Sequence, residues 1–142
     1  MDYKFYSELP KDAKKIREEV FIIEQGFKNE FDEIDIMSIH LVIYIKTIPV
    51  ATARLYQRDK SNEYVIGRVA VLSEYRKEKL GTKLLELLEN KALELGAKKI
   101  SLSAQYKIKS FYEKQNYKSI SDVYYEEHCK HIKMEKELGG VK

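Results

Sequence analysis

Apolar residues recur at helical spacing in two long segments of the chain, and each segment predicts a helix with one buried face. The first helix is expected from residue 7 or 8 to about residue 25, with Pro10 near its start and Gly26 after its end. Its apolar face consists of Ala13, Ile16, Val20 and Ile23. The second helix is expected to follow Arg76, to run to about Leu95 and to end at Gly96. Its apolar face consists of Leu80, Leu84, Leu88, Ala92 and Leu95.

Shorter apolar runs between turn signals predict strands. They are expected at residues 3–6, 39–45, 50–56, 64–72, 99–103, 117–125 and 131–135, with turns at 47–49 and 58–62 and the last two runs forming a hairpin. The run 64–72 is apolar on both faces, which favours the centre of a sheet. With the helix after it and the strand 99–103, it forms a parallel crossover unit. A third helix is expected at 109–115, ended by Asn116, since asparagine tolerates left-handed backbone angles. The pattern predicts one α+β domain over residues 1–142 with a mixed sheet.

Composition narrows the class of protein. A chain of 142 residues with 44% hydrophobic residues is the size of one globular domain. The single cysteine, Cys129, cannot form an internal disulfide, and we find neither a secretion signal nor a membrane-spanning run, so we expect a cytoplasmic protein. Lysines alternate with glutamates and the net charge is only +3, which argues against a nucleic-acid partner.

The segment 67–88 carries the clearest candidate chemistry. A β-branched run leads through a polar turn into a helix that contains Gly81 in its first turn. Free backbone N–H groups and the positive end of the helix dipole suit a diphosphate at such a point. The amides that could converge there belong to Lys77, Glu78, Lys79, Gly81 and Thr82, with charge from Arg76. Alone, the pattern also fits an ordinary turn between a strand and a helix.

A second candidate is the run Phe111-Tyr-Glu-Lys-Gln-Asn-Tyr117. Phe111 and Tyr117 fit a role in the core. Tyr112 could instead face a ligand, because a buried tyrosine hydroxyl needs a hydrogen-bond partner.

Taken together, these two segments resemble the acetyl-CoA signature of the GNAT N-acetyltransferase superfamily, Gln/Arg-x-x-Gly-x-Gly/Ala followed by Phe-Tyr-x-x-x-Gly-Phe. Further similarity to its small ElaA-like branch involves Glu18, Val20, Phe21, Glu24, Gln25, His40, Ala104, Gln105 and the ending Glu126-Glu127…His131-Ile132-Lys133-Met134. The resemblance implies a central, mostly antiparallel sheet of about seven strands flanked by about four helices. Lys79 and Asn116 stand where the family has glycines. We expect a helical φ at Lys79, and weakened or altered coenzyme A binding.

The resemblance also implies a mechanism. A primary amine would attack the acetyl-CoA thioester directly, with Tyr112 protonating the leaving thiolate because a phenol pKa of about 10 is close to that of a thiol. Glu24 is the first candidate for the general base and His40 the second, with a water chain as an alternative. The implied cofactor-binding residues are Val69, Ala70, Val71, Arg76, Lys77, Glu78, Lys79, Leu80, Gly81, Thr82, Gln105 and Phe111.

Several alternatives stay open at this point. The acidic segment 30–35 would either attract a cationic amine or form a solvated loop. His128-Cys-Lys-His131 offers too few ligands for zinc, so no metal is expected. The acceptor would be a small-molecule amine or a protein or peptide amine, no membrane partner is expected, and a homodimer is conceivable. The competing hypotheses are a non-catalytic acyl-CoA-binding or regulatory domain, and an interaction module without coenzyme A.

Overall fold

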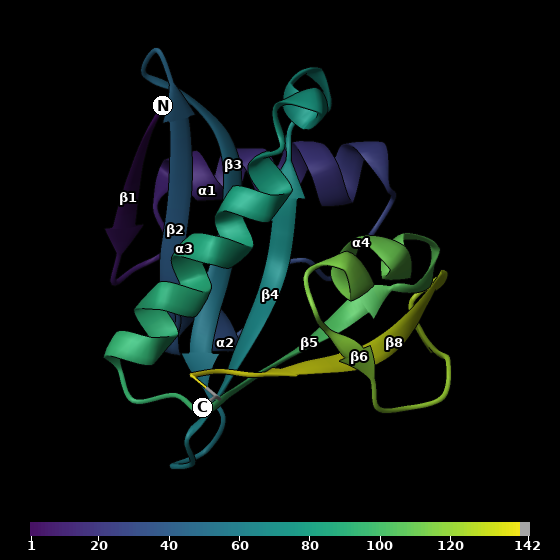
Figure 1. Cartoon of the computed structure of the whole chain (residues 1–142). Helices are drawn as coiled ribbons and strands as arrows, with labels where there is room; N and C mark the ends of the chain where they lie inside the picture. The colour runs from purple at the N-terminus through teal and green to yellow at the C-terminus, as the bar shows by residue number, and fades with distance from the viewer. Residues whose placement is uncertain (140–142) are drawn as a thin grey trace.

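A mixed β-sheet runs through the centre of the protein (Figure 1), of which a computed structural model describes residues 1–139. In the described residues its strands are β1 (Asp2–Tyr6), β2 (Ile39–Ile45), β3 (Ile48–Gln57), β4 (Glu63–Val71), β5 (Lys99–Gln105), β6 (Lys118–Ser119), β7 (Tyr124–Glu126) and β8 (Cys129–Glu137). They lie in the order β1-β2-β3-β4-β5-β8-β6, and β7 pairs with β8. Among these pairs β4 and β5 are parallel and the others antiparallel, which confirms the predicted mixed α+β architecture.

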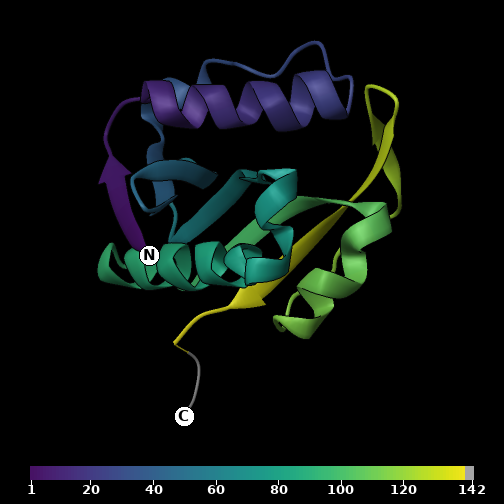
Figure 2. The ribbon, with the colours of Figure 1, turned by 90° about the horizontal axis from the view of Figure 1, so that it is seen from above.

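Helices cover both faces of the sheet. They are α1 (Lys11–Arg17), the π-helix η1 (Glu18–Glu24), α2 (Ile34–Met37), the 3₁₀ helix η2 (Ser73–Glu78), α3 (Leu80–Glu94), the 3₁₀ helix η3 (Tyr106–Ile108) and α4 (Lys109–Lys114). Figure 2 shows α1 and η1 on one face, and α3 and α4 on the other. None of the helices in residues 1–139 has the length and apolar character needed to cross a membrane.

Strand alternation divides the core between these two layers. On β2, Leu41 and Ile43 pack in the cluster beneath α3, whereas Val42 packs with Ile16 and Val20 of the first helix. Successive side chains of a strand point to opposite faces of its sheet, so a strand with helices on both faces is apolar throughout.

The first helix departs from the predicted pattern after Arg17. Ile23 is 70% exposed and Phe21 is buried in its place. The cause is the change to a π-helix, whose i→i+5 hydrogen bonds, such as Gln25 N–H to the Val20 carbonyl, widen the turn and rotate the following side chains. At the end of α3, Leu95 is likewise exposed, because the helix ends at Glu94.

Four other boundaries differ from prediction. The segment 28–38, predicted to be irregular, contains α2. The turn between β2 and β3 lies at Lys46 and Thr47, which both have positive φ, and β3 therefore begins at Ile48. The expected strand 117–125 is two short strands, β6 and β7, each paired with β8. The helix after Arg76 starts only at Leu80, behind η2. Asn116 has a φ of 74°, as predicted for the end of α4.

The divergence of β4 from β5 positions the site. The two strands pair only as far as Ile66 and Leu102, after which β5 continues alongside β8 (Figure 1). A β-bulge at Arg68, which has a φ of 53°, puts two β4 residues opposite Ala53 of β3. In residues 1–139, the β5-facing edge of β4 beyond Ile66 therefore has no neighbouring strand.

Candidate active site

A cleft of about 1440 Å³ opens where β4 leaves β5. Most of the residues predicted to bind the cofactor line it, together with both predicted catalytic residues. They are Val69, Ala70, Val71, Arg76, Lys79, Gly81, Thr82, Gln105, Phe111, Tyr112 and Glu24. Lys77, Glu78 and Leu80 do not line it. Leu80 is 3% exposed and belongs to the core beneath α3, so the prediction that it contacts a cofactor applies at most to its backbone amide.

The start of α3 differs from expectation at Lys79. Its φ is 59° and its ψ 30°, so the backbone is left-handed rather than helical. This conformation explains why the family signature has glycine here, since a side chain is strained at positive φ. Leu80, Gly81 and Thr82 follow in the first helical turn, where backbone N–H groups have no partner within the helix.

Gly81 gives α4 room to approach α3. A Cβ atom at Gly81 would lie 3.2 Å from Cζ of Phe111, which is closer than most real Cβ contacts, so the ring would have to shift. The ring of Phe111 meets that of Tyr112 edge-on, with centroids 5.0 Å apart. The absence of a side chain at Gly81 therefore helps to place Tyr112 at the cleft.

Arg76 and Glu24 both line the cleft and form an ion pair with each other. Nη1 and Nη2 of Arg76 each donate to a Glu24 carboxylate oxygen at 2.6 Å, and Nε donates to the Val71 carbonyl at 3.0 Å. The hydrogen bonds from Arg76 lower the pKa of Glu24. A carboxylate with a lowered pKa is a weak base, and this guanidinium already has partners on all three nitrogens.

Tyr112 lies at the inner end of the cleft and is 5% exposed. The phenol is protonated at neutral pH, and burial raises its pKa further above the usual value. Tyr117 behind it donates to Glu89 at 2.8 Å, as a core tyrosine would.

A second cavity, of about 440 Å³, lies on the other side of this junction. It shares six residues with the larger cleft, namely Gln25, Phe27, Val69, Gln105, Ile108 and Tyr112. The two cavities therefore meet at Tyr112 and the free edge of β4.

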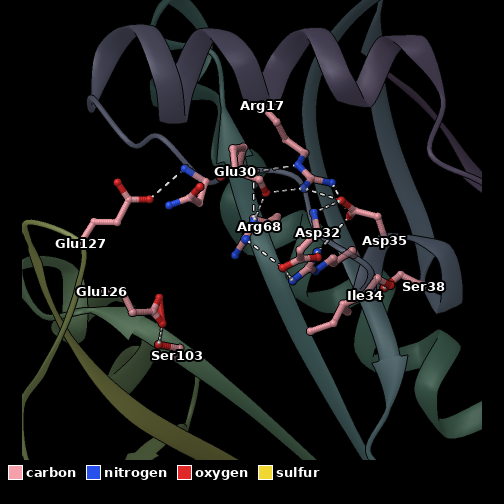
Figure 3. A network of polar contacts seen from close by, with 12 residues as sticks. Arg17, Glu30, Asp32, Ile34, Asp35, Ser38, Arg68, Ser103, Glu126 and Glu127 are labelled. Atoms are coloured by element: carbon pink, nitrogen blue, oxygen red, sulfur yellow. Dashed lines mark hydrogen bonds and ion pairs between the residues drawn. The ribbon is translucent and has the colours of Figure 1, made fainter.

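A cluster of three arginines and three carboxylates lies at the smaller cavity (Figure 3), and four of its members, Glu30, Asp32, Arg54 and Arg68, line the cavity. Arg17 donates to Glu30 at 2.8 Å and to Asp35 at 2.7 Å. Its other members are Arg54, Arg68 and Asp32. The formal charges of this arginine–carboxylate cluster cancel. Glu30, Asp32 and Asp35 of the acidic segment are thus paired with arginines from α1, β3 and β4, whereas Glu33 is exposed.

His40 does not line either cavity. It is 1% exposed, and its Nε2 donates to the Asp35 carbonyl at 2.9 Å. Burial lowers the pKa of its imidazole. The structure therefore assigns His40 a structural hydrogen bond, and the proposal that it serves as a base finds no support in its position.

The structure brings a different histidine to the smaller cavity. His131 of β8 is 5% exposed, and its Nε2 lies 3.5 Å from Oε1 of Glu126. The sequence showed both residues as parts of a family-like ending, but no local spacing connects them with the first helix or with β5. His128 lies apart in the β7–β8 turn, with its ring 4.9 Å from that of Phe27.

Comparison with known proteins agrees with this geometry. The family model for an acetyltransferase (GNAT) domain matches residues 10–138. YjcF of Bacillus subtilis (strain 168), described as an uncharacterized N-acetyltransferase, is 34% identical over 114 residues, 79% of this chain and 80% of the relative. Protein ElaA of Escherichia coli (strain K12) is 31% identical over 129 residues, 87% of this chain and 84% of the relative.

Solved structures show the same fold. The crystal structure of Escherichia coli ElaA superposes with a TM-score of 0.84 at 27% identity, covering 95% of this chain and 98% of the other. An aminoglycoside 6'-N-acetyltransferase complexed with coenzyme A has a TM-score of 0.78 at 17% identity, with 100% and 99% coverage. The chain belongs to the GNAT acetyltransferase family.

Proposed function

We propose that the protein is an acetyl-CoA-dependent N-acetyltransferase that transfers the acetyl group directly to a primary amine. The observation that carries the proposal is the cleft of about 1440 Å³, which joins the first turn of α3 to the free edge of β4 and to Tyr112. A helix start, an open strand edge and a protonated phenol are the three groups that a diphosphate, an amide-containing arm and a leaving thiolate require.

Each part of the cleft has a role in this proposal. Backbone amides of Lys79, Gly81 and Thr82 would bind the diphosphate. The backbone of Val69 and the N–H of Val71, whose carbonyl already accepts from Arg76, would bind the pantetheine arm. A strand N–H would stabilise the oxyanion that develops on the thioester carbonyl. The other predicted contacts with the cofactor, including Gln105 and Phe111, belong to the same proposal.

Tyr112 is proposed as the general acid. The amine nitrogen forms a bond to the thioester carbon, the carbon–sulfur bond breaks, and the sulfur takes the phenolic proton. Burial keeps that proton on the phenol before the reaction, although it makes the phenol a weaker acid than its usual pKa suggests.

Replacing Tyr112 by phenylalanine tests the proposal. With acetyl-CoA and a panel of primary amines, we expect Tyr112→Phe to lower the rate of coenzyme A release by on the order of 10²-fold, with unchanged acetyl-CoA affinity by calorimetry. Tyr3→Phe, on exposed β1 at the far edge of the sheet, is the matched control. Unchanged turnover in Tyr112→Phe would rule out this role.

The same assay separates the competing hypotheses. Stoichiometric acetyl-CoA binding without coenzyme A release from any amine would favour the non-catalytic acyl-CoA-binding domain. No binding at all would favour an interaction module.

A further inference from the structure

The smaller cavity carries a pair of groups that the acid chemistry of Tyr112 does not use. We propose that this cavity receives the acceptor amine, and that His131 together with Glu126 removes its proton. The inference rests on the proposed acetyltransferase function and adds the missing base.

The position of the His131 ring is defined by a hydrogen bond and two aromatic contacts. Its Nδ1 lies 3.0 Å from the Cys129 carbonyl, which can only accept, so Nδ1 carries a proton, and in the neutral imidazole Nε2 has the lone pair. The Tyr124 ring lies nearly parallel to the imidazole, at 28°, and Phe27 meets it edge-on, at 67°. Since the imidazole is fixed in one tautomer and one orientation, its basic nitrogen faces Glu126.

Glu126 is suited to hold a cation at that point. Its Oε2 accepts a hydrogen bond from Ser103 of β5 at 3.0 Å, and its Oε1 lies 3.5 Å from Nε2 of His131. The side chain is 42% exposed, and among the described residues no arginine or lysine forms an ion pair with it. An ammonium group has three donors and could donate to Nε2 and Oε1 at once.

The other charged groups of the cavity are paired, so the Glu126 carboxylate is the group that would attract a cationic amine. The arginine–carboxylate cluster on the opposite wall has no net formal charge (Figure 3). Glu127 points away to the backbone N–H groups of Lys28 and Asn29, at 2.9 and 3.0 Å. The cavity, of about 440 Å³, is within the range of small-molecule sites, which favours a small cationic amine.

The proton balance is complete with these groups. The acceptor enters as R–NH₃⁺ and gives one proton to Nε2 of His131, which releases it to solvent. The neutral amine then attacks the thioester carbon. When the amide forms, the nitrogen loses a second proton. That proton restores the phenol of Tyr112, which has given its own proton to the coenzyme A sulfur. The imidazolium that forms lies 3.5 Å from the Glu126 carboxylate, which stabilises it.

The pH dependence of turnover tests the inference. The titratable groups in contact with the imidazole, among residues 1–139, are Glu126 and Tyr124 of β7, while Ser103 and Gln105 of the adjacent β5 are uncharged. We expect His131→Gln to lower kcat at neutral pH by on the order of 10²-fold, and the loss to diminish at high pH, where the free amine is abundant. Acetyl-CoA affinity should be unchanged, which separates loss of the base from misfolding.

Glu126→Gln provides a second variant, at a half-buried position. Removing the carboxylate disfavours the imidazolium, so the acid limb of the pH–rate profile should move to lower pH, and KM for 1,4-diaminobutane should rise. Lys133→Gln, exposed on the same strand as His131, is the control. A wild-type pH–rate profile in His131→Gln would overturn this inference but leave the proposed function standing. Absence of coenzyme A release by the wild-type chain would overturn the proposed function and this inference with it.

Discussion

At the scale of single residues, Lys79 shows the strain that a functional turn can impose. The family signature predicts glycine at this position, and the structure gives the reason, a φ of 59° immediately before α3. A side chain at such an angle costs about 1 kcal/mol, because Cβ approaches the backbone carbonyl. The lysine also lines the cleft, so its ammonium can compensate by approaching an anionic ligand.

We therefore expect Lys79→Gly to raise the free energy of unfolding by about 0.5–1 kcal/mol, which urea denaturation would measure. The matched control is Lys83→Gly in the first part of α3, which should lower it by about 1 kcal/mol because glycine is a poor helix former. A loss of stability in Lys79→Gly similar to that in Lys83→Gly would show that the left-handed turn carries no strain.

At the scale of elements, the Glu24–Arg76 pair connects the end of η1 with η2. Both side chains are 41% exposed, so the pair contributes at most about 1 kcal/mol to stability despite its bidentate geometry. The pair matters because Glu24 occupies the Arg76 guanidinium. Arginine binds anions through two parallel hydrogen bonds, so this guanidinium would otherwise be available to an anionic ligand at this end of the cleft.

Glu24→Gln distinguishes a Glu24 that only pairs with Arg76 from a Glu24 that serves as the general base. With the ion pair weakened, we expect Arg76 to become available to acetyl-CoA, so that KM for acetyl-CoA falls while kcat stays within about twofold. Steady-state kinetics with varied acetyl-CoA would measure both. A 10²-fold fall in kcat, the size expected for a lost base, would instead restore Glu24 as the base.

At the scale of the whole molecule, the arginine–carboxylate cluster connects four parts of the chain: α1, β3, β4 and the segment that precedes β2. Asp35 is its central acceptor, with bonds from Arg17 and Arg54 at 2.7 and 2.9 Å. Burial by itself would raise the pKa of Asp35, but the hydrogen bonds and charges of these arginines lower it to about 2. Breaking a buried ion pair on one side leaves the other charges uncompensated.

Asp35→Asn should thus lower the free energy of unfolding by about 3 kcal/mol at neutral pH. Because the folded pKa is depressed, the stabilisation is present above the ordinary pKa and is lost as the pH falls towards about 2. The difference between wild type and variant in urea denaturation should accordingly shrink below about pH 4. Glu33→Gln, an exposed neighbour, should change stability by less than about 0.5 kcal/mol, and a pH-independent difference for Asp35→Asn would contradict the argument.

The accuracy of the sequence predictions follows the range of the interactions involved. The two long helices, most strands and the glycine or asparagine ends were predicted correctly, because period and capping are local properties. The exposed Ile23 was missed, since it lies in a π-helix, whose period differs from the 3.6-residue period on which the prediction rests. The division of 117–125 into two strands was missed, because β6 and β7 each pair with a different part of β8 and the apolar pattern does not show where the first strand stops.

The sequence by itself determined the α+β pattern, a helix with Gly81 in its first turn and the Phe111-Tyr112 pair, and thereby the resemblance to the GNAT family. Only the tertiary structure decided which partner each charged group has. It paired Glu24 with Arg76, 52 residues away, and Ser103 with Glu126, 23 residues away. Such pairs depend on how β4 diverges from β5 and where the β7–β8 hairpin returns. No local period encodes that geometry, because it results from the packing of the whole sheet between its helices.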